Sequence, residues 1–299
     1  MIDNPPSPQV SIGLPVFNGE KSIAQALDSL LAQTFTDFEL IVSDNASTDT
    51  TSLLCAAYAS RDSRIKYVNQ PNNSGGFLNF KYVLQKAQAK YFMWAAADDH
   101  WYPEFIAKNH SVLEQNPRIV SSISKVRMRT YLEMAPKKIG TFPIRGEYSE
   151  RLWQYLSMPA ANSRFYGLFR RQQLLDSYVT ENFYASDWAI MINTLRHGDF
   201  FEWNEVLMER GYHGESSAKR LVDQLKDFHL KRPKSLFPLY EFTRWLWLNI
   251  NRADFIRCLV PILNLNLWYE FILWAELISI RKKVNGALVF QLPWGSVNK

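Results

Sequence analysis

The chain has 299 residues, of which 47% are hydrophobic and 21% charged, and its formal net charge is +5 at pH 7. This composition excludes an intrinsically disordered protein, because disordered chains lack the apolar surface that offsets the entropy lost on ordering. The positive charge indicates an anionic partner, which could be nucleic acid, a membrane surface or a phosphorylated substrate.

The length predicts one large domain with a small extension, since single cores stop growing near roughly 250 to 300 residues. The two cysteines, Cys55 and Cys258, have neither the spacing of a metal site nor the density of a disulfide framework. The first residues show no basic stretch followed by an apolar run, so no signal peptide is expected. Together these observations predict a cytoplasmic protein.

The first 100 residues alternate strand-like and helix-like patterns. The predicted strands are 10–17, 38–43, 65–70 and 91–97, and apolar residues at helical spacing lie between them. Repeated units of this length predict an α/β fold with a mostly parallel sheet and helices on both faces. Polar clusters follow the strands at Asn18, Asp44, Asn73 and Asp98. Because ligands of such sheets bind beyond the carboxyl ends of the strands, these clusters should converge on one crevice.

The rest of the chain divides in two near residue 218. Further elements are predicted at 103–115 (helix), 119–129 (strand), 165–171 (strand) and 187–196 (helix), with a patternless loop up to about residue 163. From about residue 221 the sequence consists of helical stretches dense in Trp, Phe and Leu. We therefore expect a domain over 1–218 and a C-terminal helical region over 219–299.

Two adjacent carboxylates, Asp98 and Asp99, end the fourth predicted strand. Neighbouring like charges are costly unless a cation compensates them, and carboxylate oxygens suit Mg²⁺ or Mn²⁺, which typically bring a diphosphate. The alternative is a solvated turn that caps the following helix. The chain has no G-x-G-x-x-G after the first strand, no P-loop, no H-E-x-x-H and no C-x-x-C, which excludes the usual dinucleotide, P-loop and zinc signatures.

Four motifs, in this order, resemble glycosyltransferase family 2. They are 10–18 (VSIGLPVFN), 41–49 (IVSDNASTD), 73–75 (NSG) and 97–99 (ADD) followed by Pro103. The resemblance covers residues 9 to about 217. It implies the GT-A fold, a Rossmann-like, mostly parallel sheet flanked by helices, here with a C-terminal helical extension.

The resemblance also implies a donor site. It assigns Pro15 and Phe17 to the frame around the nucleobase and Asp44 to the base imide, since a uracil or thymine N–H needs an acceptor. Glu20 and Asn79 are further lining residues in this interpretation. The alternative for Asp44 is an Asx turn.

The metal motif departs from the family pattern. The family usually shows D-x-D, and Ala96 occupies the position of the first Asp. This leaves Asp98 as the expected ligand of Mg²⁺ or Mn²⁺, with Asp99 beside it at the metal and the nucleotide. His100 is a weaker candidate for the same site.

Residues 165–171 and 186–188 resemble the acceptor-side strand and the E-D pair of the family, with Ser186 replacing Glu and Asp187 retained. The resemblance implies that Asp187 is the catalytic base, although a carboxylate at a helix start is also a good N-cap. Arg210 and His213 resemble a segment that reaches the diphosphate, and they are weaker candidates.

The resulting hypothesis is an inverting transfer of sugar from a UDP- or dTDP-sugar to a hydroxyl of a saccharide or lipid-linked acceptor, in cell-surface polysaccharide synthesis. Two alternatives remain open: a nucleotide-sugar pyrophosphorylase-like enzyme, and a non-catalytic sugar-nucleotide-binding protein of the same fold. Nucleic acid is not expected, because Lys and Arg are scattered and the motif clusters are acidic.

Residues 236–292 predict a surface role for the C-terminal region. Their apolar runs fall short of a bilayer span, and the interrupting residues are Pro261, Asn264, Asn266, Glu270 and Glu276. Aromatic-rich helices next to Arg281, Lys282 and Lys283 suit the anionic, cytoplasmic face of a membrane. Packing on the main domain or in a homodimer is the equally open alternative.

Overall fold

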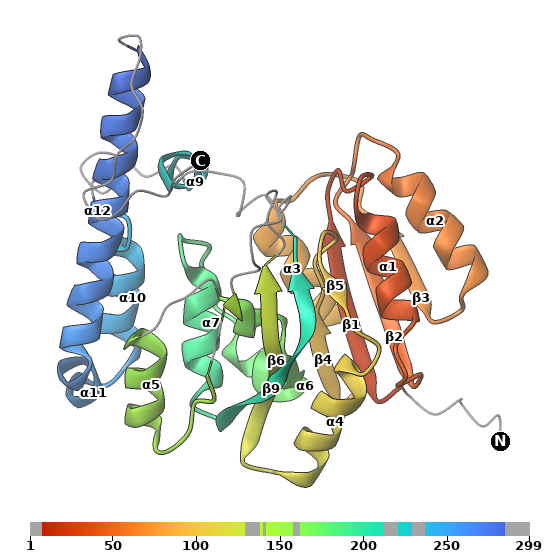
Figure 1. The fold of residues 1–299 in the computed structure, drawn as a ribbon, viewed down its shortest axis with the longest axis horizontal. Coiled ribbons are helices and arrows are strands. Elements are labelled where there is room, and N and C mark those ends of the chain that lie inside the picture. The colour runs from red at the N-terminus through yellow and green to blue at the C-terminus, as the bar shows by residue number, and fades with distance from the viewer. Residues whose placement is uncertain are drawn as a thin grey trace.

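The computed structural model describes residues 8–128, 138–139, 142–157, 162–211, 221–228 and 237–284. Its centre is one sheet whose strand order is β3-β2-β1-β4-β8-β6-β9-β5, with β7 paired to β6 (Figure 1). The strands are β1 (Val10–Val16), β2 (Phe38–Asp44), β3 (Ile65–Asn69), β4 (Tyr91–Trp94), β5 (His100–Trp101), β6 (Ile119–Met128), β7 (Lys138–Ile139), β8 (Leu168–Arg170) and β9 (Asp199–Arg210).

Strands β1 to β4 pair in parallel, and so do β6 and β9. The short strand β8 is antiparallel to both β4 and β6 and joins the two parallel groups. Every residue of β1 and β2 is buried, as expected for parallel strands covered on both faces. The predicted α/β class with a mostly parallel sheet is confirmed.

Helices cover both faces of the sheet. They are α1 (Ile23–Leu31), α2 (Thr51–Arg61), α3 (Gly76–Lys86), α4 (Phe105–Gln115), α5 (Tyr148–Ser157), the 3₁₀ helix η1 (Ser163–Tyr166), α6 (Arg171–Ser177) and α7 (Ser186–Thr194). One hydrophobic cluster lies under α1 and α4, and a second under α3, α5 and α7. Gly13 of β1 allows α3 to approach closely, because a Cβ there would lie 2.6 Å from Cγ2 of Val83.

The C-terminal region is helical, with α9 (Leu221–Asp227), α10 (Tyr240–Asn249), α11 (Arg252–Arg257) and α12 (Leu259–Val284). These helices stand beside α5 and α7, at the opposite end of the molecule from α2 (Figure 1). Phe242, Leu246 and Ile262 belong to the same hydrophobic cluster as α5 and α7. In the part of the chain that the structure describes, no helix is long and apolar enough to cross a membrane.

Several predicted elements need correction. The expected strand 91–97 ends at Trp94, and 165–171 divides between η1 and β8. The patternless region before residue 163 contains α5, and β5 and β9 were not predicted. Pro261, one of the residues that interrupt the apolar runs, lies in the first turn of α12, where the N–H that proline lacks has no partner within the helix.

Candidate active site

The loops after β1 and β2 interlock at the carboxyl edge of the sheet. The amide of Asn18 donates to Oγ of Ser47 (2.9 Å), and the amide of Thr48 donates back to Oδ1 of Asn18 (2.8 Å). Asn18 and Ala46 have positive φ angles of 50° and 59°, which turn both loops sharply at the strand ends. The two motifs therefore form one structural unit.

The other two polar clusters join the same edge. Nδ2 of Asn45 donates to Oδ1 of Asn73 (2.8 Å), which ties the loop after β3 to the loop after β2. A Cβ on Gly19 would lie 3.4 Å from Cβ of Ala97, so the loop after β4 lies against the loop after β1. The four clusters that the sequence separates thus meet at one edge of the sheet.

The predicted nucleobase residues occupy different environments. Pro15 is buried within β1, and the side chain of Phe17 is 36% exposed at the edge. Asp44 is fully buried, and its carboxylate accepts hydrogen bonds from the amide of Ser47 (2.9 Å) and the hydroxyl of Tyr67 (3.3 Å). The first bond is local, but it reaches the amide three residues on, whereas an Asx turn, the alternative considered, bonds the amide two residues on. Recognition of a base by Asp44 stays a prediction.

Glu20 and Asn79 also hold elements of this sheet edge together. One carboxylate oxygen of Glu20 accepts from the amide and the hydroxyl of Thr50, at 3.1 and 2.9 Å. The buried amide of Asn79 accepts from Oγ of Ser43 (2.6 Å) and donates to its carbonyl (2.9 Å), which fixes α3 to the end of β2. Their contact with a nucleotide stays a prediction.

The two acids after β4 are held by the end of β9. The amide of Gly211 donates to Oδ1 of Asp99 (2.9 Å). A Cβ on Gly211 would lie 2.6 Å from Oδ2 of Asp98, so only glycine allows this approach. His100 begins β5, pairs with Glu209 of β9 and packs its ring against Tyr102.

Arg210 brings the acids after β4 and the predicted catalytic base into one electrostatic group. Its guanidinium carbon lies 4.8 Å from the centre of the Tyr166 ring, and Nη1 donates to Oγ of Ser163 (3.4 Å). Burial alone would lower the pKa of Arg210, but Tyr166 and the carboxylates of Asp98, Asp99 and Asp187 raise it. His213, the neighbouring weaker candidate, lies outside the described residues.

Asp187 lies in the first turn of α7, directly after Ser186, and the turn before it has Ala185 in the left-handed region (φ 70°). Oδ2 of Asp187 accepts from Nδ2 of Asn162 (2.9 Å). Burial raises the pKa of Asp187, and this rise is partly offset by the Asn162 bond, the amides of the first helical turn and Arg210. A carboxyl with a raised pKa is suited to accept a proton near neutral pH.

Three residues of this arrangement were missed at the sequence level, namely Asn162, Tyr166 and Gly211. Of these, Tyr166 lies within the segment 165–171 and Gly211 directly follows Arg210, but the direction of the Tyr166 ring depends on η1 and the approach of the Gly211 backbone depends on β9. Asn162 lies in the region where no pattern was found.

The carboxylates at this edge indicate how a divalent ion would be held. No group of three or more His, Cys, Asp and Glu side chains suited to an ion occurs among the described residues. Mg²⁺ commonly uses one or two carboxylates together with phosphate oxygens of the substrate. Asp98 and Asp99 fit an ion that arrives with a diphosphate, and the carboxylate of Asp99 already accepts a hydrogen bond from the amide of Gly211.

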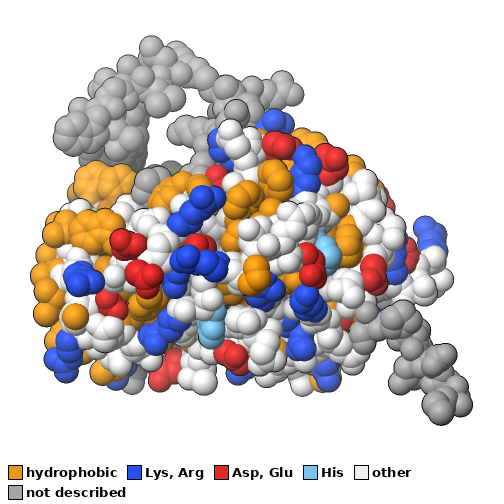
Figure 2. All heavy atoms as spheres, turned by 90° about the horizontal axis from the view of Figure 1, so that it is seen from below, with side chains coloured by type: hydrophobic (Ala, Val, Ile, Leu, Met, Phe, Trp, Pro, Cys, Tyr) orange, Lys and Arg blue, Asp and Glu red, His pale blue; other side chains and the backbone are white. Residues whose placement is uncertain are grey.

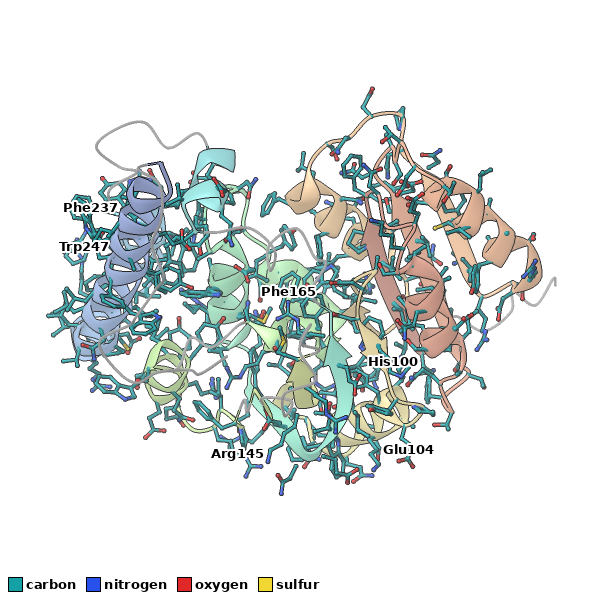
Figure 3. All side chains as sticks on the ribbon, turned by 45° about the horizontal axis from the view of Figure 1, so that its top comes forward. His100, Glu104, Arg145, Phe165, Phe237 and Trp247 are labelled. Atoms are coloured by element: carbon teal, nitrogen blue, oxygen red, sulfur yellow. The ribbon has the colours of Figure 1, made fainter. Side chains whose placement is uncertain are left out.

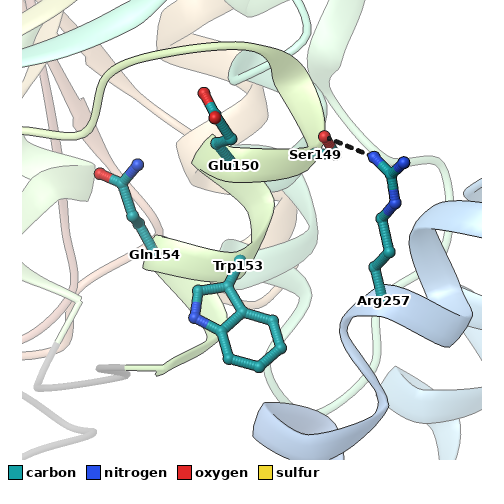
Figure 4. A pocket seen from close by; sticks show the side chains of 5 residues that line it. All are labelled: Ser149, Glu150, Trp153, Gln154 and Arg257. Carbon is teal, nitrogen blue, oxygen red and sulfur yellow. Dashed lines mark hydrogen bonds between the residues drawn. The ribbon is translucent and has the colours of Figure 1, made fainter.

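A surface groove lies elsewhere, between α5 and α11 (Figure 4). Its lining residues are Ser149, Glu150, Trp153, Gln154 and Arg257. Nη1 of Arg257 donates to Oγ of Ser149 across it (3.2 Å). None of the predicted site residues lines this groove.

Comparison with known sequences places this arrangement in context. Residues 11–174 match the model of Glycosyl transferase family 2. An uncharacterized glycosyltransferase of Rickettsia typhi is 25% identical over 238 residues, which cover 76% of this chain and 71% of that protein. A second one, of Rickettsia prowazekii, is 26% identical over 74% of this chain and 70% of that protein.

Solved structures share the fold. TarS 1–349 of S. aureus in complex with UDP-GlcNAc has a TM-score of 0.58 and 17% identity, covering 85% of this chain and 79% of that chain. The match to a longer TarS structure covers only 44% of that chain. The mannosyltransferase PcManGT of Pyrobaculum calidifontis, in complex with GDP-Man and Mn²⁺, has a TM-score of 0.60 and 15% identity, covering 94% and 76%. At these identities the likeness shows the GT-A fold alone.

Proposed function

Since the chain belongs to glycosyltransferase family 2 and is a glycosyltransferase, we propose that it moves a sugar from a nucleoside-diphosphate sugar to an acceptor hydroxyl with inversion. The observation that carries this proposal is the position of Arg210, whose pKa responds to Asp98, Asp99 and Asp187 together. One cation thus interacts electrostatically with both the acids proposed for the diphosphate and the proposed catalytic base.

The proposed reaction is a single displacement. Asp187 takes the proton of the acceptor hydroxyl, and that oxygen forms a bond to the anomeric carbon. The bond from the anomeric carbon to the diphosphate breaks, and the nucleoside diphosphate leaves with the electron pair. Arg210 stabilises the charge that develops on the leaving group. A Mg²⁺ or Mn²⁺ ion bound at Asp98 and Asp99 would supply further positive charge at the diphosphate.

The nucleoside is proposed to be uridine or thymidine, bound between Phe17 and the loops after β1 and β2. Two structural neighbours support a nucleotide-sugar donor, because TarS was solved with UDP-GlcNAc and PcManGT with GDP-Man. Thermal-shift measurements with UDP-, dTDP- and GDP-sugars, each with and without Mn²⁺, identify the donor. Stabilisation by GDP-sugars alone would contradict the proposal that the nucleobase is uracil or thymine.

The test of the mechanism is Asp187→Asn. With the nucleotide sugar that gives the largest thermal shift, the rate of nucleoside diphosphate release should fall about 10² to 10⁴-fold. The Kd of the free nucleotide should stay within about twofold of the wild-type value. Asp176→Asn is the matched control, because Asp176 lies on α6 and accepts from Gln172 at the surface. Full activity of Asp187→Asn would exclude the role of Asp187 as base.

We further propose that residues 236–292 contact the cytoplasmic face of a membrane, where a lipid-linked acceptor of cell-surface polysaccharide synthesis would lie. Within the part of α12 whose side chains are described, Asn264 is the one exposed position that is not apolar. The exposed apolar side chains are Leu259, Val260, Leu263, Leu267, Trp268, Phe271, Trp274 and Ile278. In Figure 2 hydrophobic side chains gather on the left flank of the molecule, where the C-terminal helices stand.

The exposed charges of the C-terminal helices support an anionic membrane surface as their partner. Over residues 237–278 the exposed charged side chains are those of Arg244, Arg252 and Arg257. Arg252 lies over the exposed ring of Trp247, 4.1 Å from its centre, and Trp247 and Phe237 project from the same outer side in Figure 3. Such a surface combines apolar area with positive charge, as interfacial helices do. The side chains of Arg281, Lys282 and Lys283 lie outside the described residues.

This proposal divides the chain into a transferase domain over 1–218 and a contact region over 219–299. A homodimer built on the same apolar face is the competing arrangement, and the vesicle experiment below separates the two.

A further inference from the structure

A short relay of hydrogen bonds leads from α5 to the proposed base. The hydroxyl of Tyr155 donates to Oδ1 of Asn162 (3.0 Å), and Nδ2 of Asn162 donates to Oδ2 of Asp187 (2.9 Å). We propose that Asn162 is a positioning residue that orients the carboxylate of Asp187 and keeps it ionised, and that Tyr155 fixes the direction of the Asn162 amide. This inference rests on the proposed function of Asp187.

The direction of the amide follows from its neighbours. A carboxamide has one donor end and one acceptor end, whereas an ionised carboxylate only accepts. If the amide were turned round, its oxygen would face the carboxylate of Asp187 and its NH₂ group would face the hydroxyl of Tyr155. Tyr155 is buried, and burial together with the charge of Asp187 raises its pKa well above the usual value, so it remains a protonated donor.

Asn162 is held by the core as well as by its side chain. It directly precedes η1, and its carbonyl accepts from the amide of Phe165 (3.1 Å). The ring of Phe165 stacks on Trp94 at the end of β4, with centroids 4.1 Å apart and planes 1° from parallel. Phe165 lies at the centre of the molecule in Figure 3. The position of Asn162 is therefore set by the packing of the strand that precedes Asp98.

The groups around Asp187 explain why one hydrogen bond matters. Only Arg210 offers a formal positive charge among the described groups that shift its pKa. The phenols whose pKa values respond to Asp187 are Tyr155 of α5, Tyr166 of η1, Tyr178 after α6, Tyr184 before α7 and Tyr269 of α12. Burial raises the pKa of Asp187, and the bond from Asn162 is the largest contribution that lowers it. Loss of that bond should therefore raise the pKa of Asp187 further.

The test is a direct titration of the Asp187 carboxyl carbon by ¹³C NMR, assigned by its absence in Asp187→Asn. In Asn162→Ala the pKa of Asp187 should rise by about one to two units, the size expected for losing a hydrogen bond to a charged group. Asn162→Asp preserves side-chain size and places a second carboxyl beside Asp187, so the pair should titrate in two steps with the upper pKa raised at least as far, and this variant reports even where the alanine variant is unfolded.

Tyr155→Phe should give a smaller upward shift, because the amide keeps its place but loses the group that orients it. Tyr148→Phe is the matched control on the same helix, where the ring lies beside Arg196, and it should leave the titration unchanged. Unchanged titration in both Asn162 variants would overturn the inference.

The two proposals can fail separately. If Asp187→Asn retains donor turnover, the role of Asp187 as catalytic base is excluded, independent of the results for the Asn162 variants. If Asp187→Asn is inactive and Asn162→Asp still titrates and turns over the donor as the wild type does, the positioning role fails alone.

Discussion

The guanidinium carbon of Arg210 lies 4.8 Å from the centre of the Tyr166 ring, and the charge of this side chain interacts with the acids after β4 and with Asp187 in the first turn of α7. The ring fixes the plane of the guanidinium, and Ser163 holds one of its nitrogens. The planar fork of arginine can stack on the ring and donate to Ser163 at the same time, whereas the compact ammonium of lysine cannot do both in this geometry.

Replacing Arg210 should therefore impair turnover even when the charge is kept. We expect Arg210→Ala to lower donor turnover about 10² to 10³-fold, as for loss of a donor to a developing negative charge, and Arg210→Lys to recover little of it. Steady-state release of nucleoside diphosphate measures both. Arg61→Lys, at an exposed position on α2, is the control and should behave as the wild type. Wild-type turnover in Arg210→Lys would show that charge alone suffices.

Gly211 makes a steric prediction. A Cβ at this position would lie 2.2 Å from the carbonyl oxygen of Asp98, so Gly211→Ala must shift that backbone or the end of β9. We expect nucleotide binding in the presence of Mn²⁺ to weaken about tenfold or more by calorimetry, since the acids lose their placement. Gly76→Ala is the control, because a Cβ there meets nothing within 4 Å.

The acidic site should bind metal together with nucleotide. Because no group of three or more His, Cys, Asp and Glu side chains suited to an ion occurs in the described ranges, Mn²⁺ added to the protein alone should give no measurable heat of binding, whereas Mn²⁺ added with UDP should bind and tighten UDP binding in return. Asp98→Asn should abolish that mutual effect. Tight binding of Mn²⁺ without nucleotide would contradict the proposal that Asp98 and Asp99 bind the ion only together with a diphosphate.

Glu39 predicts an acid-sensitive step in stability. It is buried, and although burial alone would raise its pKa, Lys66, Ser11 and the amide of Gln88 together lower it below 4.5. Because the folded pKa is the lower one, this stabilisation is complete well above pH 4.5 and is lost as the pH falls through the folded pKa. Glu39→Gln should lower the free energy of unfolding by about 1.5–3 kcal/mol at pH 7 and by less at pH 3, measured by urea denaturation. The exposed Glu104→Gln serves as control.

The C-terminal face makes a prediction about vesicles. Changing Arg244, Arg252 and Arg257 to Gln should reduce binding to phosphatidylserine vesicles on the order of 100-fold, at about 1 kcal/mol for each basic residue. A control with the same change of charge alters the exposed residues Arg61, Lys86 and Arg118. Leu267→Ser should weaken vesicle binding without changing the mass in solution. If the wild type does not bind vesicles and forms a dimer that dissociates in Leu267→Ser, the apolar face contacts a second copy of the chain and not a membrane.

The sequence predicted most of the first half of the fold because its strands are buried runs that end in recognisable turn residues. It did not predict β9, whose exposed middle residues Asn204 and Glu205 hide the strand pattern. It also missed α5, which the local sequence does not mark with a clear cap. The convergence of Asn18, Asp44 and Asn73 could be predicted, because the carboxyl ends of parallel strands share one edge.

The rest of the site could not be predicted from short motifs. Asn162 reaches Asp187 across 25 positions of sequence, and Gly211 reaches Asp99 across 112. Such contacts depend on how β8, β9 and η1 pack, which periodicity does not report. Even Asp44, correctly placed at the edge, has both carboxylate oxygens engaged within the protein.

The interlocked loops after β1 and β2 have a mechanical consequence. Asn18 and Glu20 each donate through the amide and accept through the side chain, so neither loop can open without breaking bonds that belong to the other. The amide protons of Asn18, Glu20, Thr48 and Thr50 should consequently exchange with deuterium at a common rate, as one cooperative opening unit. A nucleotide entering this edge would meet a preformed wall rather than two independent flaps.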